Sequence, residues 1–204
     1  MDSTFSVATM ILRGYNYEQV RLVVEVLKGS KIKNVEVTLN TENAIEIIKK
    51  ISDEYSSVMN IGAGTVLSYE ELVQAVEAGA KFVLAPNMMS AKMIDYCKSK
   101  GIISVPGAFT ASEISECFKM GADIVKIFPA NELSYNYAQK VCEPLGDFPL
   151  MAVGGVNAEN VKDVLSGSYK YVGTAGGIFK KEDIISMNEA KMRESLQRFE
   201  AALL

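Results

Sequence analysis

Residues 123–130 read Asp-Ile-Val-Lys-Ile-Phe-Pro-Ala, an apolar strand with one lysine, Lys126, in its middle and a proline at its end. An unpaired ammonium is expensive to desolvate in such a strand, so its pKa falls and the amine becomes neutral. A neutral buried amine is a nucleophile, and its typical electrophile is a carbonyl. We therefore predict that Lys126 forms a Schiff base. The alternative is a buried lysine that pairs with a carboxylate for structure alone.

The same kind of unit, an apolar strand followed by an amphipathic helix, repeats along the chain. Glycine, proline or a polar residue ends the strands, and the helices show apolar side chains at 3.6-residue spacing. Ser68, for example, begins a helix with Glu71 three residues on, as in a capping box, and Gly79 ends it. The predicted strands are 7–12, 33–39, 58–61, 82–85, 102–105, 124–128, 149–153 and 169–172. The predicted helices are 18–27, 41–51, 68–79, 90–100, 110–121, 134–143, 157–166 and 181–203.

Eight strands that alternate strictly with eight helices require parallel strands joined by right-handed crossovers. Because no linker or break in composition interrupts them, they favour one compact α/β domain over 1–204, a closed (β/α)8 or TIM barrel. An amphipathic C-terminal helix over 181–203 completes it. An open doubly wound sheet is the alternative. The Gly-x-Gly at 62–64 is not a dinucleotide fingerprint, since it lacks the third glycine and follows the third strand.

Composition limits the chemistry and the partners. The net charge of −4 gives no electrostatic reason to expect nucleic acid or an anionic membrane as a partner. No apolar run is long enough to span a bilayer, and 1–9 lacks the pattern of a signal peptide. The three cysteines, Cys97, Cys117 and Cys142, have unrelated spacings and indicate a reducing cytoplasm. The sequence has no histidine, which removes Ser-His and Cys-His mechanisms and most zinc or iron sites, so we expect no metal and no cofactor.

Polar residues and glycines gather where the predicted strands end. In a (β/α)8 barrel the active site is built from the C-terminal ends of the strands and the loops that follow them. The residues found there, in chain order, are Arg13, Glu36, Thr38, Thr65, Pro86, Asn87, Thr110, Lys126, Gly154, Gly155, Gly173 and Thr174. The sequence thus predicts one site at this end of the barrel.

Two charged residues at strand ends complement Lys126. Glu36 lies between Val35 and Val37 in an apolar strand, so strand alternation points it into the barrel or at its rim. There it can stabilise the lysine and move protons as a general acid/base, or form a plain ion pair. Arg13, one of four arginines, can grip a substrate carboxylate with its guanidinium fork, or form a surface salt bridge.

Two glycine-rich loops follow the seventh and eighth strands. Gly154 and Gly155 precede the helix predicted from Asn157, so bare backbone amides and a helix N-terminus offer an anion site. Gly173 and Thr174 begin a second flexible loop beside it. Glycines also end strands for steric reasons alone, which is the alternative. The two loops together predict a phosphate site.

These residues resemble the family of 2-keto-3-deoxy-6-phosphogluconate / 4-hydroxy-2-oxoglutarate aldolases. The similarity runs in order through most of the chain, and the motifs taken together are very specific. They are Leu12-Arg13-Gly14, Glu36-Val37-Thr38-Leu39-Asn40-Thr41, Gly62-Ala63-Gly64-Thr65-Val66-Leu67, Val105-Pro106-Gly107, Lys126-Ile127-Phe128-Pro129 and Val153-Gly154-Gly155-Val156.

The resemblance implies a metal-independent class I aldolase on a (β/α)8 barrel, usually a homotrimer. It also implies a role for several residues of this chain. Lys126 is the Schiff-base lysine, Glu36 the general acid/base, Arg13 and Thr65 bind the pyruvyl carboxylate and neighbouring polar groups, and Gly154 and Gly155 form the phosphate loop.

Some positions depart from the gluconate-type pattern of this family. Such members typically have Arg where this chain has Asn40, and Ser-Pro-Gly where it has Ala85, Pro86 and Asn87. They have Pro-Thr-Gly-Gly where this chain has Ala-Val-Gly-Gly. These variants are more similar to the 2-dehydro-3-deoxy-6-phosphogalactonate branch. The serine expected after the eighth strand in phosphate-binding members is missing, and whether Thr174 takes its place stays open.

We therefore expect a cytoplasmic carbon–carbon lyase that cleaves a 2-keto-3-deoxy-6-phospho sugar acid, of gluconate or galactonate type, to pyruvate and glyceraldehyde 3-phosphate. Phe128 and Pro86 are expected to pack the pyruvyl methyl and exclude water. Asn40, Gly173 and Thr174 complete the predicted substrate-binding set. Three alternatives stay open: an aldolase of unphosphorylated 4-hydroxy-2-oxo acids, a phosphate-binding isomerase or synthase without a Schiff base, and a catalytically silent binding or assembly barrel.

Overall fold

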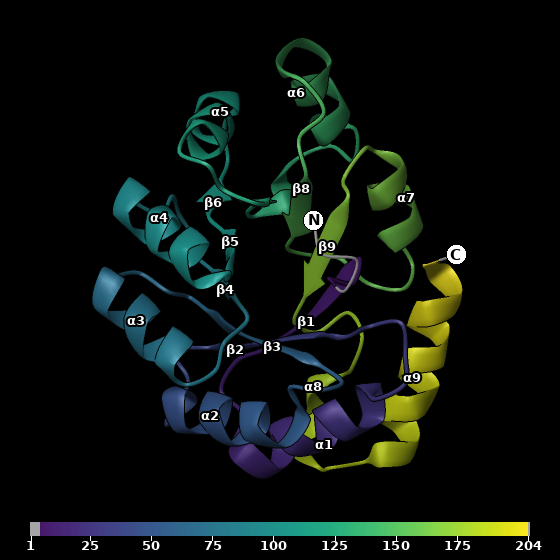
Figure 1. Ribbon diagram of the computed structural model, residues 1–204. Coiled ribbons are helices and arrows are strands. Elements are labelled where there is room, and N and C mark those ends of the chain that lie inside the picture. The colour runs from purple at the N-terminus through teal and green to yellow at the C-terminus, as the bar shows by residue number, and fades with distance from the viewer. Residues whose placement is uncertain (1–4, 204) are drawn as a thin grey trace.

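The computed structural model describes residues 5–203, in which parallel strands form one curved sheet with helices packed around it (Figure 1). The strand order is β5-β4-β3-β2-β1-β9-β8-β7-β6, so neighbours in the sheet are neighbours in sequence except where β1 pairs with β9. The strands are β1 Ala8–Leu12, β2 Asn34–Thr38, β3 Asn60–Gly64, β4 Phe82–Leu84, β5 Ile103–Val105, β6 Gly107–Ala108, β7 Val125–Ile127, β8 Leu150–Val153 and β9 Tyr171–Thr174.

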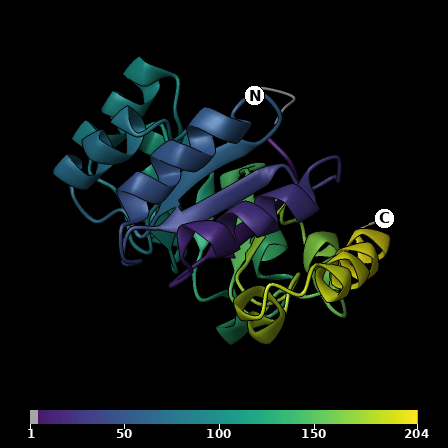
Figure 2. The ribbon, with the colours of Figure 1, turned by 90° about the horizontal axis from the view of Figure 1, so that it is seen from below.

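The helices lie outside the strands, as the view from below also shows (Figure 2). The last two helices contact each other and α1. The helices are α1 Tyr17–Leu27, α2 Ala44–Tyr55, α3 Tyr69–Glu77, α4 Ala91–Lys100, α5 Ala111–Lys119, the 3-10 helix η1 Ala130–Glu132, α6 Tyr137–Leu145, α7 Val161–Ser166, α8 Lys181–Ile185 and α9 Glu189–Ala202. No helix within residues 5–203 is both long enough and apolar enough to cross a membrane.

The two ends of the sheet order, β5 and β6, are pieces of one strand. Pro106, which has no backbone N–H to give to a ladder, separates them. On one side Ala85 N donates to Val105 O at 3.1 Å, and on the other Lys126 N donates to Pro106 O at 2.9 Å. This strand therefore bridges β4 and β7 and closes the barrel, which confirms the predicted (β/α)8 architecture over the open-sheet alternative.

The inside of the barrel is filled at its N-terminal end. Phe82 is fully buried there, and Phe5 packs edge-on against it with ring centroids 5.3 Å apart. Gly62 makes the room, because a Cβ at that position would lie 2.4 Å from the Phe82 ring. Other members of this inner cluster are Ile11, Leu84, Val105, Ile124, Met151 and Val153. Among the described residues, this packing leaves the C-terminal ends of the strands as the side from which a ligand can enter the barrel.

Two predicted helices differ from the structure near the C-terminus. The stretch 181–203 is two helices, because Met187 adopts a left-handed φ of 52° and the Asn188 side chain accepts a hydrogen bond from Lys191 N at the start of α9. The helix expected over 157–166 begins only at Val161, after a turn. The order and type of the predicted elements are otherwise as observed.

Candidate active site

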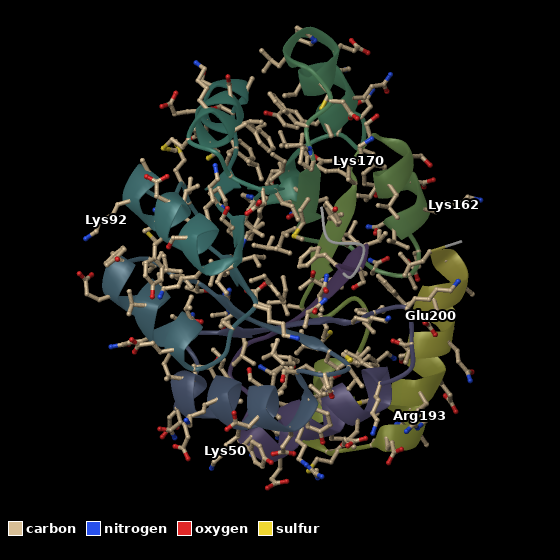
Figure 3. All side chains as sticks on the ribbon, in the orientation of Figure 1. Lys50, Lys92, Lys162, Lys170, Arg193 and Glu200 are labelled. Atoms are coloured by element: carbon tan, nitrogen blue, oxygen red, sulfur yellow. The ribbon has the colours of Figure 1, made fainter. Side chains whose placement is uncertain are left out.

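Lys126 lies in β7 with its side chain inside the barrel and only 6% exposed. Its neighbours in the strand, Val125 and Ile127, belong to the core under the helices. Burial lowers the pKa of the Lys126 ammonium, and the nearby Glu36 carboxylate opposes that shift. Other lysines, such as Lys92 on α4, extend away from the barrel (Figure 3). The amine of Lys126 is thus biased toward its neutral, nucleophilic form.

Glu36 reaches the same space from β2 and is 1% exposed. Gly64 on the neighbouring strand gives it room, because a Cβ there would lie 1.5 Å from Glu36 Oε1. Within residues 5–203, Glu36 Oε2 has no hydrogen-bond partner. Burial raises the pKa of Glu36 to about 7, while Lys126 and Arg13 act in the opposite direction. The carboxyl group can therefore take up or release a proton near neutral pH.

Both side chains line one cavity of about 390 Å³ at the C-terminal end of the barrel. We call it the site cavity. Eight of the predicted site residues line it: Arg13, Glu36, Lys126, Phe128, Gly154, Gly155, Gly173 and Thr174. The ring of Phe128 has its centroid 4.7 Å from Lys126 Nζ.

Six of the residues predicted for this end of the barrel do not line the site cavity, namely Thr38, Asn40, Thr65, Pro86, Asn87 and Thr110. Asn40 is exposed in the turn after β2, and Thr65 follows β3 with a left-handed φ of 57°. Pro86 is half-buried after β4, where its carbonyl packs against Gly107. The part they play in substrate binding remains a prediction.

A larger cavity of about 560 Å³ opens between the starts of α1 and α2, and it contains none of the predicted site residues. Two of its charged groups, Glu46 and Lys50, form an ion pair at 2.7 Å, and the third, Glu42, is exposed. Lys50 also lies 5.3 Å from the centroid of the Tyr17 ring. The buried, chemically competent groups are those of the site cavity.

The two glycine-rich loops bring main-chain donors to the site cavity. Four residues that line it have N–H groups with no hydrogen-bond acceptor in the described chain, namely Gly155, Val156, Ala175 and Gly176. Thr174 joins the loops, since its Oγ1 donates to Val156 O at 2.6 Å and accepts from Gly177 N at 2.9 Å. Together they form a concave surface of amides suited to an anion.

The helix that follows does not add the N-terminal donors that the sequence predicted. Asn157 Oδ1 accepts from Glu159 N at 2.8 Å, and Asn160 Oδ1 accepts from Asn157 N at 2.9 Å. These side chains occupy the amides ahead of α7, which itself spans six residues. The loop amides, and not a helix end, are the free donors at the site cavity.

The sequence reasoning did not assign a role to Gly64 or to the amides of Ala175 and Gly176. A signal for Gly64 was present, because Gly62 and Gly64 alternate within one strand and so face the barrel interior together. A pair of inward glycines beside a strand that carries Glu36 marks the space this side chain fills.

Comparison with known proteins agrees with this geometry. A family model described as KDPG and KHG aldolase matches residues 6–195. A probable 2-dehydro-3-deoxy-6-phosphogalactonate aldolase of Rhizobium meliloti is 29% identical over 171 residues, which are 83% of this chain and 80% of that protein. A solved structure described as native KDPGal is 25% identical with a TM-score of 0.85, and covers 96% of this chain and 95% of its own. The KDPG aldolase of Legionella pneumophila, with pyruvate captured as a covalent carbinolamine intermediate, is 26% identical with a TM-score of 0.82, covering 94% and 93%.

The raised pKa of Glu36 predicts an unusual titration. In the wild type its carboxyl should titrate with a midpoint near pH 7. Carbon-13 NMR of the protein with labelled glutamate measures this titration, and the signal that is lost in Glu36→Gln belongs to Glu36. In Lys126→Met the midpoint should rise further, because a positive neighbour that favours the carboxylate is gone. A wild-type midpoint near the ordinary 4.5 would contradict the burial argument.

The same shift has a consequence for stability. Between pH 4.5 and about 7 the folded chain keeps the Glu36 proton that the unfolded chain has lost. This contribution to the free energy of unfolding is therefore complete below pH 4.5 and is lost as the pH rises through about 7. Glu36→Gln, the matched control, should remove this part of the pH dependence in urea unfolding.

Proposed function

The chain belongs to the KDPG and KHG aldolase family and is a carbon–carbon lyase, and we propose that it cleaves a 2-keto-3-deoxy-6-phospho sugar acid to pyruvate and glyceraldehyde 3-phosphate. One observation carries the proposal: a buried amine and a buried carboxyl, Lys126 and Glu36, share the site cavity. A similar structure holds pyruvate as a carbinolamine, which is the first covalent intermediate of a Schiff-base aldolase.

The first half of the proposed reaction builds an electron sink. The neutral Nζ of Lys126 adds to the C2 carbonyl carbon and forms a C–N bond, and proton transfers complete the carbinolamine. Glu36, in its acid form, then gives a proton to the departing hydroxyl, so water leaves and an iminium remains. A carboxyl whose pKa is raised to about 7 has a protonated fraction for this step at neutral pH.

The second half breaks the carbon–carbon bond. Glu36, now a carboxylate, removes the proton of the C4 hydroxyl, and the C3–C4 electron pair moves into the iminium. The aldehyde leaves and an enamine stays on Lys126. Glu36 returns its proton to C3, and water hydrolyses the resulting iminium to release pyruvate and the free amine. One carboxyl group therefore serves every proton transfer in turn.

The carboxylate end and the phosphate end of the substrate are proposed to bind to different groups of the site cavity. Among residues 5–203, Arg13 and Lys126 are the only cationic side chains that line the site cavity, so Arg13 is proposed to bind the pyruvyl carboxylate. The loop amides, led by Gly155 and Val156, are proposed to bind the 6-phosphate. Phe128 contributes an apolar wall for the pyruvyl methyl.

The residues outside the site cavity complete the proposal. Asn40, Thr65 and Pro86 follow the neighbouring strands β2, β3 and β4, so they are proposed to contact the substrate from the rim. These contacts would distinguish the gluconate type from the galactonate type, because the C4 hydroxyl, whose configuration differs between them, lies between the two anionic ends of the substrate.

Homotrimeric assembly in the cytoplasm is part of the proposal. Large apolar side chains are exposed on loops that follow strands at the site end of the barrel, among them Leu67 and Phe109. We propose that these side chains belong to an apolar patch that the assembly covers. The three cysteines are free, as in proteins of a reducing compartment. Light scattering that gives the mass of one chain would contradict the trimer.

Steady-state cleavage tests the assigned chemistry. Pyruvate release from 2-keto-3-deoxy-6-phosphogluconate and from its galactonate epimer is followed with lactate dehydrogenase. Glu36→Gln should lower kcat by about 10²–10⁴-fold, the usual contribution of a general acid/base. Lys126→Met should abolish turnover, and Lys92→Met, which removes an exposed lysine, should retain it. Turnover by Lys126→Met would contradict the mechanism.

The phosphate is tested with 4-hydroxy-2-oxoglutarate, which the alternative aldolase would cleave to pyruvate and glyoxylate. If the loop amides bind phosphate, the unphosphorylated substrate should have a kcat/KM lower by roughly 10- to 100-fold, the effect of losing charged hydrogen bonds. Equal kcat/KM values for the two substrates would favour the alternative substrate class.

A further inference from the structure

A second, smaller cavity lies behind the loop of Gly154 and Gly155. Its volume is about 90 Å³, and we call it the back cavity. Gly154, Gly155 and Val156 line both the back cavity and the site cavity. This short loop therefore separates the two cavities. A molecule in the back cavity would contact the same loop whose amides line the site cavity.

Tyr169 lines the back cavity and is 3% exposed. Its hydroxyl has no hydrogen-bond partner among residues 5–203. Burial raises the pKa of this phenol, so it stays protonated and able to donate. A buried hydroxyl without a partner is destabilising, and ordered water commonly satisfies such groups.

The back cavity has the size and the polar lining that water requires. A water molecule takes about 30 Å³ of liquid volume and needs two or more polar partners, so a few molecules fit here. Besides the Tyr169 hydroxyl, the peptide groups of Gly154 are available, since its N–H and C=O make no hydrogen bond within the described chain. Asn131 Oδ1 also borders Gly154, lying 2.8 Å from where a Cβ on that glycine would be.

Within the described chain, side-chain hydrogen bonds hold this loop at Gly155 and Val156, and β8 leads into it at Gly154. Asn160 Nδ2 donates to Gly155 O at 2.9 Å, and Thr174 Oγ1 donates to Val156 O at 2.6 Å. Gly154, with a φ of 115°, has no comparable side-chain contact to its peptide groups. Groups in the back cavity can therefore hydrogen-bond the peptide of Gly154 and hold this upstream part of the loop.

We propose that Tyr169 is a positioning residue for the anion-binding loop. Through ordered water in the back cavity, its hydroxyl holds the Gly154 peptide so that the N–H groups of Gly155 and Val156 point at the substrate phosphate. This inference rests on the proposed function. Tyr169 does not line the site cavity, so its effect is on phosphate binding and not on the chemistry at Lys126.

Tyr169→Phe tests the proposal because it removes the hydroxyl and keeps the ring. The KM for the phosphorylated substrate should rise about tenfold, the effect of one lost hydrogen bond, with kcat within about twofold. The pyruvate concentration that gives half-maximal borohydride trapping should not change, since pyruvate carries no phosphate. Tyr55→Phe is the matched control, because Tyr55 is 5% exposed and donates to Glu25 Oε1 at 2.7 Å from α2, away from the loop. It should leave both quantities unchanged.

The melting temperature gives a second reading. The proposal predicts that Tyr169→Phe lowers Tm, because the variant loses the water bridge between the hydroxyl and the loop. A raised Tm would mean that the hydroxyl has no partner and would contradict the proposal. An unchanged KM for the phosphorylated substrate, or a parallel loss of pyruvate affinity, would overturn the proposal. The wild type alone tests the proposed function. If it does not cleave the phosphorylated substrate, or if the phosphate does not raise kcat/KM, the phosphate site and this inference both fail.

Discussion

The structure depends on burying an amine and a carboxyl in the same narrow barrel. Burial acts on them in opposite directions, lowering the pKa of Lys126 and raising that of Glu36, while their mutual attraction resists both shifts. No ion pair within 4.0 Å joins the two in the described chain. Burial therefore biases each group toward its neutral form and leaves it free to react, which a tight ion pair would prevent.

Space for this pair comes from residues without side chains. Gly62 admits the Phe82 ring that fills the lower barrel, and Gly64 admits the Glu36 carboxyl above it. Phe82 fills the interior below the pair, so in the described chain Lys126 and Glu36 are largely desolvated and face the site cavity. A methyl group at either glycine would displace one of these side chains, so the same short strand sets both packing and chemistry.

The alternation of strands and helices was enough to predict the barrel. A charged residue within an apolar strand was enough to single out Lys126 and Glu36, which are both buried at one cavity; their catalytic roles stay predictions. Local pattern predicted these because each signal lies within a few residues. The bare amides of the Gly154 and Gly155 loop were predicted from the sequence, whereas Tyr169 and the free amides of Ala175 and Gly176 could not be predicted this way, since what matters is which groups they face across the fold. The start of α7 was predicted too early, at Asn157, because asparagine side chains bind the amides there and the helix begins only at Val161.

The central claim is that Lys126 carries the substrate as a Schiff base. Borohydride reduction in the presence of pyruvate, followed by mass spectrometry of the digested protein, tests it most directly. We predict a reduced pyruvate adduct on the peptide that contains Lys126, absent from Lys126→Met and independent of any phosphate. A folded wild-type protein that forms no adduct, or forms it on another lysine, would contradict the account.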